Sequence, residues 1–345
     1  MKAAFINNHG DLEQIQYGEL DIPKIGPNEV LIESKFSALN HLDIFVVRGW
    51  PGLKLTMPHV IGADGSGVIK EVGSAVTAVS EGDRITINPG ISCGKCEMCL
   101  SGQQVFCRSF SIKGEHQWGT FAEYFKMPEI NVLKIPDAYP FDKAAAAPLT
   151  FLTAWRMLRT QANVKPDEFV FIHGAGGGVA TAAIQIAKYL GAKVITTTST
   201  SEKIQKAKEL GADHVINYKE MKDYSKHVFI DLTKRRGIDV VIDNVGQATF
   251  PTSVRLLRPG GRLVTCGATT GPKTKVMINQ IFWKQLEIKG STMANQGEFR
   301  EVMKLVLDGK ITPIIDKIFP LEQARDAEKY LNDANQFGKI LLKID

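Results

Sequence analysis

One stretch of the chain constrains its fold more than any other, an apolar run that passes through a glycine-rich turn into a helix-forming segment. Phe169–His173 is followed by Gly174-Ala-Gly-Gly-Gly178, and a helix is expected over Ala180–Leu190. Glycines allow a tight turn, and the helix that follows faces an anion with free N–H groups and its positive dipole end. A glycine-rich turn can also occur without a ligand. The strand–turn–helix context favours dinucleotide binding here.

Strands and helices alternate downstream of this turn. Another helix is expected over Glu202–Glu209, and Gly191 and Gly211 end the two helices. Strands are expected at Lys193–Thr198, His214–Asn217, Val240–Asp243 and Arg262–Cys266. This alternation is typical of a parallel sheet with helices on both faces. Residues 153–290 are therefore predicted to form a doubly wound α/β domain.

Both ends of the chain have a mainly β pattern. Short strand-like segments broken by proline and glycine occur at Met1–Ile6, Val30–Ser37, Gly67–Val72 and Arg84–Asn88. The C-terminal part adds two amphipathic helices and a strand, around Phe299–Leu307, Leu321–Leu331 and Lys339–Ile344. We predict that residues 1–152 and 291–345 form one domain into which the doubly wound domain is inserted. The 345 residues suit about two domains.

Four of the five cysteines lie close together, at Cys93, Cys96, Cys99 and Cys107. Zinc prefers four thiolates in a tetrahedral shell, and one loop with short spacings can supply all four. The alternative, a pair of disulfides, needs an oxidising compartment. The chain opens MKAAFINNHG, without the pattern of a signal peptide, and we expect a cytoplasmic protein. We predict one structural zinc in a lobe at about residues 91–110.

Composition limits the partners. Apolar residues make up 44% and charged residues 23%, as in soluble globular proteins, and no apolar run approaches the roughly 20 residues of a membrane span. The net charge of +5 is spread along the chain. It gives weak support for an anionic ligand and none for nucleic acid. We expect a small-molecule substrate, with no nucleic-acid or membrane partner.

The residues after Lys193–Thr198 bear on which dinucleotide is bound. An acidic residue is expected there when the ligand is NAD, to hold the ribose 2′-hydroxyl, but no acid occurs before Glu202. Ser199 and Lys203 can instead receive a 2′-phosphate, which a carboxylate would repel. Ser199 and Thr200 could also simply cap the next helix. We predict NADP(H) rather than NAD(H).

Several further segments, together with the glycine turn and the cysteine run, resemble the medium-chain dehydrogenase/reductase superfamily over essentially the full length. They are Ile61–Gly67, Gly119–Tyr124, Ala182–Ala187, Leu210–Tyr218, Asp239–Gly246 and Phe337–Leu341. The resemblance implies a GroES-like catalytic domain, a Rossmann cofactor domain, an active site between them, and Tyr218 near the adenosine phosphate. The cofactor contacts that we predict are Gly174, Gly177, Gly178, Val179, Ser199, Lys203, Tyr218 and Gly267.

The resemblance does not extend to the ligands of a catalytic metal. Where zinc-dependent alcohol dehydrogenases of this superfamily have Cys-x-x-Asp and His-Glu, this chain has Asn40-His-Leu-Asp43 and Ala63-Asp64, and Pro148–Trp155 offers no third ligand. A catalytic zinc needs three good protein ligands, so we expect none. A different metal site built from His41, His59, Asp64 and His116 is a less favoured alternative.

Quinone reductases are resembled instead by Asn40-x-x-Asp43, Arg48-Gly49 and Pro148–Trp155, and 2-enoyl-CoA reductases by Ile61–Gly67 and Pro148–Leu158. Quinone reductases usually lack the cysteine lobe and often have Tyr where this chain has Trp50. We predict hydride transfer from NADPH to an activated C=C bond or a quinone. Asn40 would hydrogen-bond the substrate oxygen or the nicotinamide ribose, Asp43 would orient its neighbours, and His41 could relay a proton. Each could instead be structural: Asn40 satisfying backbone, Asp43 capping a turn, His41 hydrogen-bonded in place.

Two other functions compete with this prediction. One is a zinc-dependent alcohol dehydrogenase with atypical ligands. The other is a non-catalytic NADPH-binding redox sensor, for which Cys266 is a candidate thiol, although its place at the end of an apolar strand favours a core role. In this superfamily a strand at Leu286–Lys289 joins sheets across a dimer, so we expect a homodimer or homotetramer. Residues expected to set pocket size are Trp50, Phe151, Phe282, Trp283 and Met293.

Overall fold

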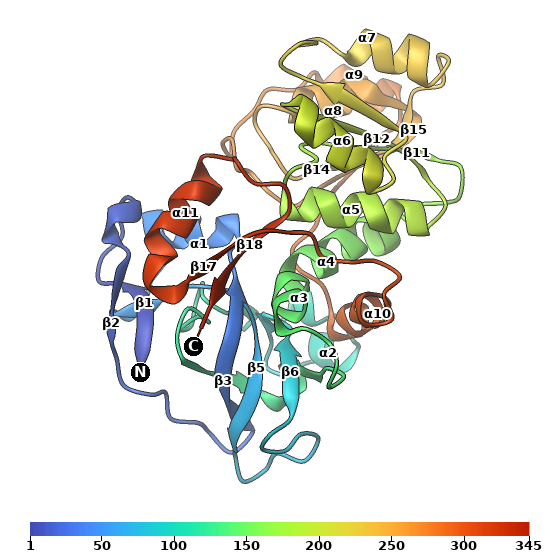
Figure 1. The fold of residues 1–345 in the computed structure, drawn as a ribbon. Coiled ribbons are helices and arrows are strands. Elements are labelled where there is room, and N and C mark those ends of the chain that lie inside the picture. Colours follow the sequence, from blue (N-terminus) through green and yellow to red (C-terminus); the bar gives the residue numbers. More distant parts are fainter. Residues whose placement is uncertain (345) are drawn as a thin grey trace. The chain divides into compact units, whose positions relative to one another are not determined.

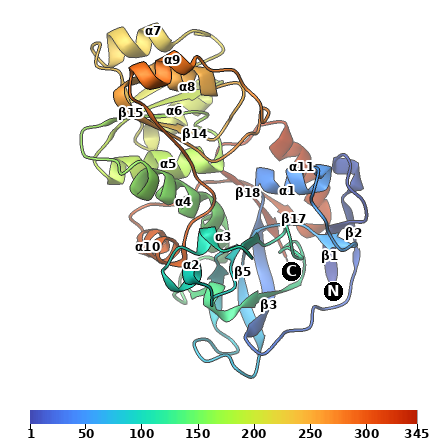
Figure 2. The same ribbon diagram turned by 180° about the vertical axis from the view of Figure 1, so that it is seen from behind.

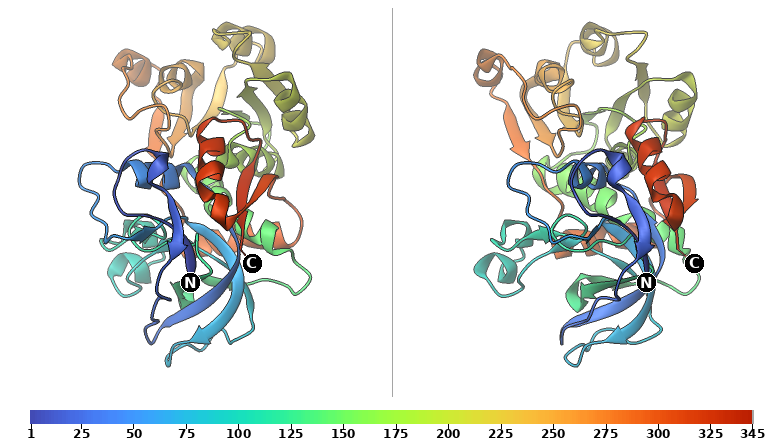
Figure 3. Two further views of the ribbon diagram at one scale, coloured as in Figure 1. Left: turned by 60° about the vertical axis from the view of Figure 1, so that its left-hand side comes forward. Right: turned by 90° about the vertical axis from the view of Figure 1, so that its left-hand side faces the viewer.

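The computed structural model describes residues 1–344 and contains two compact units (Figure 1). The terminal unit consists of Met1–Leu152 and the chain from Ala294 onward. The central unit is Thr153–Met293. The blue start and the red end of the chain belong to the same unit (Figure 3).

The terminal unit is built on three antiparallel or mixed sheets. Its largest sheet has the order β10-β6-β5-β3-β18-β17, with β9 also paired to β3. These strands are β3 (Glu29–Ala38), β5 (Asp64–Val72), β6 (Arg84–Ile87), β9 (Tyr124–Pro128), β10 (Val132–Lys134), β17 (Ile315–Pro320) and β18 (Lys339–Lys343). The C-terminal β18 pairs antiparallel with β3, so both ends of the sequence build one sheet (Figure 1).

Two smaller sheets complete the strands of this unit. They are β2-β1-β4, from β1 (Lys2–Ile6), β2 (Gln16–Glu19) and β4 (His59–Val60), and β7-β8, from β7 (Gly90–Ile91) and β8 (Ser111–Ile112). The predicted mainly β domain is confirmed. Strand β17 was not predicted, because IDKIFP shows no clear alternation and is held by its parallel pairing with β18.

The helices of the terminal unit are mostly short. They are η1 (Leu12–Gln14), α1 (His41–Arg48), α2 (Glu97–Leu100), η2 (Gln104–Phe106), η3 (Glu129–Asn131), α3 (Phe141–Ala146), α10 (Gln296–Leu307), η6 (Leu321–Gln323) and α11 (Ala324–Asn332); α4 (Pro148–Trp155) continues into the central unit. Helix α3 packs against β3, β5, β6 and β18 of the largest sheet. Helix α10 begins earlier than predicted because Asn295 N–H donates to Glu298 at 2.7 Å. The helix predicted over Leu321–Leu331 is divided between η6 and α11.

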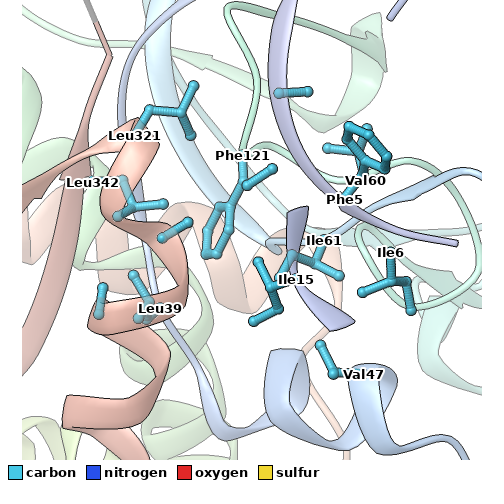
Figure 4. Packing of buried hydrophobic residues seen from close by; sticks show 14 of the residues in the cluster. Phe5, Ile6, Ile15, Leu39, Val47, Val60, Ile61, Phe121, Leu321 and Leu342 are labelled. Atoms are coloured by element: carbon cyan, nitrogen blue, oxygen red, sulfur yellow. The ribbon is translucent and has the colours of Figure 1, made fainter. Parts of the chain in front are cut away.

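The largest core of the terminal unit joins residues from both ends of the sequence. In Figure 4, Phe121 and Ile15 lie between Leu321 and Leu342 on one side and Ile61 on the other. Each large apolar side chain buried in this way contributes about 1.5–3 kcal/mol. Gly62 has φ +98°, and a Cβ there would lie 2.2 Å from the Phe121 ring, so only glycine fits beside it.

The central unit contains one six-stranded parallel sheet in the order β13-β12-β11-β14-β15-β16. The strands are β11 (Phe169–Ile172), β12 (Lys193–Thr198), β13 (His214–Asn217), β14 (Ile238–Asp243), β15 (Leu257–Thr265) and β16 (Glu287–Gly290). The predicted doubly wound sheet is confirmed, with β12 and β13 at the predicted bounds. The chain order reverses between β11 and β14, and open α/β sheets bind ligands beside the strand ends at such a switch point.

The remaining helices belong to the central unit. They are η4 (Arg156–Gln161), α5 (Gly178–Tyr189), α6 (Ser201–Glu209), α7 (Ser225–His227), η5 (Val228–Leu232), α8 (Phe250–Leu256) and α9 (Ile278–Trp283). Helices α8 and α9 lie side by side (Figure 2). Among residues 1–344, no helix combines the length and the apolar character needed to cross a bilayer.

Candidate functional site

The glycine turn of the central unit lies directly after β11, at the switch point. Gly174 has φ +68°, and its N–H donates to Thr197 Oγ1 at 3.1 Å. Gly177 is the N-cap of α5, which begins at Gly178, two residues before the predicted start at Ala180. The first-turn N–H groups, including those of Gly178 and Val179, have no acceptor within the helix. The turn can therefore hold an anion.

The other predicted cofactor residues follow neighbouring strands. Ser199 comes after β12, Tyr218 after β13 and Gly267 close after β15, so the parallel strands bring them to one edge of the sheet. Tyr218 is 43% exposed. A Cβ on Gly267 would lie 3.0 Å from the carbonyl oxygen of Asn244, which explains the glycine.

The structure shows which residue after β12 caps the helix that follows, α6. Thr200 Oγ1 accepts from the backbone N–H of Lys203 at 3.3 Å, so Thr200 caps α6. Glu202, the first acid after β12, forms an ion pair with Lys206 at 2.7 Å. Ser199 is half-buried and has no part in the cap.

A buried polar network supports this edge of the sheet and was not predicted. Asp243, at the end of β14, accepts from Gly246 N–H at 2.9 Å and from Ser253 Oγ at 2.7 Å. His173 Nε2 lies 2.8 Å from Ser253 Oγ. Burial lowers the pKa of His173 to about 4, although the Asp243 charge opposes this, so the ring is neutral at pH 7. The sequence signal for this network was the segment Asp239–Gly246, which is one of those that resemble the superfamily.

The four clustered cysteines meet in the terminal unit. Their sulfurs lie within 4.8 Å of one another. Gly94 and Gly102, at φ +71° and +77°, turn the loop around them. The lobe is tied to α10, because Val105 N–H donates to Asn295 Oδ1 at 3.1 Å.

The geometry of this cluster fits a zinc ion. A tetrahedron with Zn–S bonds of about 2.3 Å places its sulfurs about 3.8 Å apart. Cys93 and Cys99 have their sulfurs 3.8 Å apart, and Cys96 and Cys99 3.5 Å apart. These separations exceed an S–S bond, and all four cysteines are free. Backbone N–H groups of Lys95 and Cys96 lower the pKa of the Cys93 thiol to about 6. The backbone N–H of Cys99 lowers the pKa of Cys96, but the neighbouring thiols and burial outweigh it and raise that pKa to about 11.

Asn40 lies in a buried charged network of the terminal unit. Its Nδ2 donates to Asp64 Oδ2 at 3.0 Å, and its Oδ1 accepts from Lys339 Nζ at 2.6 Å. Lys339 Nζ also lies 3.2 Å from Asp64 Oδ2 and donates to Leu39 O at 2.6 Å. All four residues are buried. The network fixes the orientation of the Asn40 amide.

Asp43 holds the start of α1 in place. Its Oδ2 accepts from the backbone N–H of Asn40 at 2.7 Å, so the capping alternative for Asp43 is correct and brings it to Asn40. Burial raises the pKa of Asp43 to about 7. His41 lies between them in sequence and is half-buried. Burial and then the positive charges of Lys339 and Arg48 lower the pKa of His41 to about 4.

Comparisons with known proteins match the whole chain. Residues 26–137 match the family model "Alcohol dehydrogenase GroES-like domain", and residues 178–308 match "Zinc-binding dehydrogenase". A zinc-type alcohol dehydrogenase-like protein of Schizosaccharomyces pombe is 32% identical, with 96% of each chain covered. The chain belongs to the medium-chain dehydrogenase/reductase superfamily. The predicted resemblance is confirmed, and the protein is an oxidoreductase.

Relatives within the medium-chain dehydrogenase/reductase superfamily differ in reaction. An acryloyl-coenzyme A reductase of Sulfurisphaera tokodaii is 32% identical, with 94% of this chain and 95% of the relative covered. A crystal structure of an NAD-dependent alcohol dehydrogenase superposes with a TM-score of 0.96 at 41% identity and covers 100% of both chains. The comparisons therefore establish the superfamily but not the substrate.

The residues around Asn40 do not fit the catalytic zinc of the superfamily's alcohol dehydrogenases. Both polar atoms of the Asn40 amide are engaged. Ala63 has no donor atom. Asp64 accepts from Asn40, Lys339 and, at 2.8 Å, Leu149 N–H. A zinc ion needs three free ligands of high affinity, which this network does not supply.

The less favoured metal site is not assembled. His59 Nε2 lies 2.9 Å from the carbonyl oxygen of Gly114, and His116 Nδ1 accepts from Ile112 N–H at 3.3 Å. Within residues 1–344, the cysteine lobe is the one group of three or more His, Cys, Asp or Glu side chains whose ligand atoms come together.

Cys266 and the five residues expected to set the pocket size differ in how far they are buried. Cys266 follows β15, and burial, with the Asp243 charge, raises the pKa of its thiol to about 12. Such a thiol is not a reactive thiolate. Among the residues expected to line a pocket, Phe151 and Met293 are buried, Trp50 is partly exposed, and Phe282 and Trp283 are exposed.

Two buried residues were not predicted as site residues. Lys339, which forms the network with Asn40, lies in the segment Phe337–Leu341, and that superfamily segment was its only sequence signal. Glu328 of α11 is 0% exposed, and neither of its carboxyl oxygens has a hydrogen-bond partner in the described structure. No local pattern marks Glu328 as buried.

Proposed function

We propose that the protein transfers a hydride from NADPH to an activated C=C bond, as in an enone or enoyl thioester, or to a quinone, without a catalytic zinc. The observation that carries this proposal is the Asn40–Asp64–Lys339 network, in which the Asn40 amide and the Asp64 carboxylate are held by hydrogen bonds and an ion pair at the positions where the superfamily's alcohol dehydrogenases have zinc ligands. The 32% identity to an acryloyl-coenzyme A reductase supports the same class of reaction.

The proposed reaction suits these residues. Zinc lowers the pKa of a bound alcohol and polarises a carbonyl. A conjugated carbonyl needs less help, because it spreads the charge when the hydride arrives at the β-carbon, and hydrogen bonds can hold the resulting enolate. Asn40 is proposed to donate to the substrate oxygen or to contact the nicotinamide ribose. Lys339 keeps that amide fixed.

His41 is proposed to relay a proton as a neutral ring. Its pKa of about 4 leaves no imidazolium at pH 7. A neutral imidazole can accept a proton at one nitrogen while releasing one from the other. His41 would therefore contribute through tautomer exchange rather than as a cationic acid. A His41→Gln variant, which cannot exchange in this way, should lose kcat more than it raises KM.

We propose that the cofactor is NADP(H) rather than NAD(H). The strand end after β12 offers the Ser199 hydroxyl, and its first acid, Glu202, is engaged with Lys206. Gly174, Gly177, Gly178, Val179 and Gly267 would receive the pyrophosphate and the backbone of the cofactor, and Lys203 and Tyr218 the adenosine phosphate. When bound, the cofactor supplies the hydride, and the protein supplies orientation.

We propose that the cysteine lobe holds one structural zinc. Cys93, Cys96, Cys99 and Cys107 would fill its four positions, so this zinc would have no open position for a substrate. Its role would be to hold the loop against the start of α10, which Val105 contacts through Asn295.

We also propose that the protein forms a homodimer or a larger homo-oligomer. Strand β16 is an edge strand of the central sheet, and its backbone hydrogen-bonding groups on one side can pair with the same strand of a second copy. Next to β16 in sequence, α9 exposes 72% of Ile278, 62% of Phe282 and 83% of Trp283. Sedimentation at micromolar concentration tests this, and a monomer alone would contradict it.

One experiment separates the proposed function from its competitors. NADPH consumption is measured against quinones, 2-alkenals, enoyl-CoAs and saturated aldehydes, with metal content determined on the same sample. The proposal expects turnover of conjugated acceptors with one zinc per chain. Chelator-sensitive oxidation of simple alcohols with two zinc ions per chain would support an atypical alcohol dehydrogenase. Cofactor binding without turnover would support a redox sensor.

A further inference from the structure

Glu328 is a buried acid that the proposed reaction leaves unexplained. It lies on the inner face of α11, which packs against α1 and β18. Its side chain is 0% exposed, and neither carboxyl oxygen has a hydrogen-bond donor in residues 1–344. An ionised carboxylate without donors in such a place would cost several kcal/mol. This cost favours the neutral, protonated form of Glu328.

The surrounding charges lead to the same conclusion. The nearby buried groups are three carboxyls, those of Asp43, Asp64 and Glu328, and one ammonium, that of Lys339. Lys339 is matched by Asp64, which accepts from it. If Asp43 and Glu328 were both ionised, neither would have a buried cation of its own. Each negative charge would also repel the other and so disfavour ionisation.

The other charged groups on the elements around α11 are engaged or lie outside this cluster. Glu13 of η1 pairs with Lys329 at 2.6 Å and lies 3.5 Å from Arg325, and Asp316 of β17 accepts from the Tyr330 hydroxyl at 2.9 Å. The remaining groups, all exposed or half-buried, are His41 and Arg48 of α1, Lys317 of β17, Lys343 of β18 and Glu322 of η6.

One atom of Asp43 complements Glu328. Asp43 Oδ2 caps Asn40, whereas Asp43 Oδ1 is buried and makes no hydrogen bond within the described residues. The nearby backbone N–H of Gly62 lowers the pKa of this carboxyl but does not prevent its net rise, which burial causes. A protonated carboxyl is a donor that needs an acceptor. A single proton on Glu328 directed to Asp43 Oδ1 would satisfy both groups at once. A bound cation is disfavoured, because the ligand atoms of these acids do not come together as a cluster within residues 1–344.

We propose that Glu328 is a positioning residue, whose protonated carboxyl donates to Asp43 and so fixes the turn of α1 that presents Asn40. Asp43 can cap the Asn40 N–H only while it keeps one orientation. The proton on Glu328 would hold that orientation. Burial, with the Asp43 charge, raises the pKa of Glu328 well above its usual range, whereas Lys339 opposes the rise. This inference rests on the proposed role of Asn40.

Two variants separate this role from simple burial. Glu328→Gln keeps a neutral donor, and Glu328→Leu is neutral but has none. Wild type should lose kcat as the pH rises and Glu328 loses its proton. Glu328→Gln should keep kcat within about twofold at pH 7 and lose that alkaline decline. Glu328→Leu should lose about tenfold in kcat with KM little changed, which corresponds to one lost hydrogen bond. Asp326→Asn, on the exposed face of the same helix, is the control.

A measurement without substrate makes failure of this inference distinguishable from failure of the proposed function. Because Asp43 is itself partly protonated at pH 7, infrared spectra are compared in an Asp43→Asn background as well as in wild type. In both backgrounds a protonated-carboxyl band should be lost on Glu328→Gln and remain on Asp326→Asn. Absence of that band in wild type would overturn the inference whatever the substrate. Equal kcat for the Gln and Leu variants would also overturn it, because burial alone would then explain the residue.

Discussion

Replacement of Lys339 by methionine tests the network around Asn40 through stability. Methionine is similar in length, so it removes the ammonium without opening a large cavity. The ammonium has three partners: Leu39 O at 2.6 Å, Asn40 Oδ1 at 2.6 Å and Asp64 Oδ2 at 3.2 Å. Lys339 is 3% exposed and Asp64 is 0% exposed, so water cannot replace the lost donor.

The expected cost of Lys339→Met follows from these contacts. Removal of one partner of a buried ion pair costs about 3–5 kcal/mol, because the remaining charge is uncompensated. Two neutral acceptors, Leu39 O and Asn40 Oδ1, lose their donor as well, at about 1–3 kcal/mol each. The variant no longer has to bury a charged ammonium group, and this gain offsets part of the lost stability. Asp64 keeps the Leu149 and Asn40 donors. We expect a net loss of about 3–5 kcal/mol.

Urea denaturation measures this loss. Hydrogen exchange of β5 and β18 shows that the terminal unit is the part that is destabilised. Asp64→Asn and the double variant complete a thermodynamic cycle. The double variant should be less destabilised than the sum of the single variants, because it leaves no unpaired buried charge. A loss below about 1 kcal/mol for Lys339→Met, a value typical of an exposed ion pair, would refute the buried network.

Three further predictions follow from the site residues. Cys99→Ser should reduce zinc from one ion per chain to well below one and lower the thermal unfolding temperature, whereas Cys266→Ser, outside the lobe, should leave zinc content unchanged; equal zinc in both variants would contradict the assigned ligands. Ser199→Asp should lower kcat/KM for NADPH at least tenfold relative to NADH, because a carboxylate repels the 2′-phosphate; an unchanged ratio, against Ser201→Asp as control, would place the phosphate elsewhere. For Asp43, whose pKa rises from an ordinary 3.8 to about 7, the native state holds a proton more tightly than the unfolded state, so the free energy of unfolding should fall as pH rises from about 4 to 7, by up to about 1.4 kcal/mol per pH unit. Asp43→Asn should remove this part of the slope, and an unchanged slope in urea titrations would contradict the shift.

The sequence was informative where structure depends on local pattern. Strands β12 and β13 have the predicted bounds because glycines end the helices that precede or follow them. The metal lobe was predictable because all four ligands lie in one loop. Helix α5 begins at Gly178 rather than at Ala180, because glycines of the turn also take helical geometry. Helix α1 was not predicted, although Asn40-x-x-Asp43 is a capping pattern, because the capping alternative for Asp43 was assigned to a turn and not to the start of a helix.

The network around Asn40 was less predictable because its members are far apart in the sequence. Asn40, Asp64 and Lys339 come from three different elements, and only the pairing of β18 with β3 and of β3 with β5 brings them together. Glu328 lies on an otherwise ordinary amphipathic helix, where a glutamate is expected to face water. Its burial depends on the packing of α11 against α1 and β18, which no local pattern reports.

Transfer of deuterium from C4-labelled NADPH tests the central claim most directly. The labelled cofactor is incubated with a conjugated enoyl thioester or enone and with the matching saturated aldehyde, on protein of known zinc content. Our account predicts deuterium at the β-carbon of the conjugated substrate, no deuterium in the aldehyde's product, and one zinc per chain. Deuterium at the carbonyl carbon of the aldehyde, with two zinc ions per chain, would contradict it.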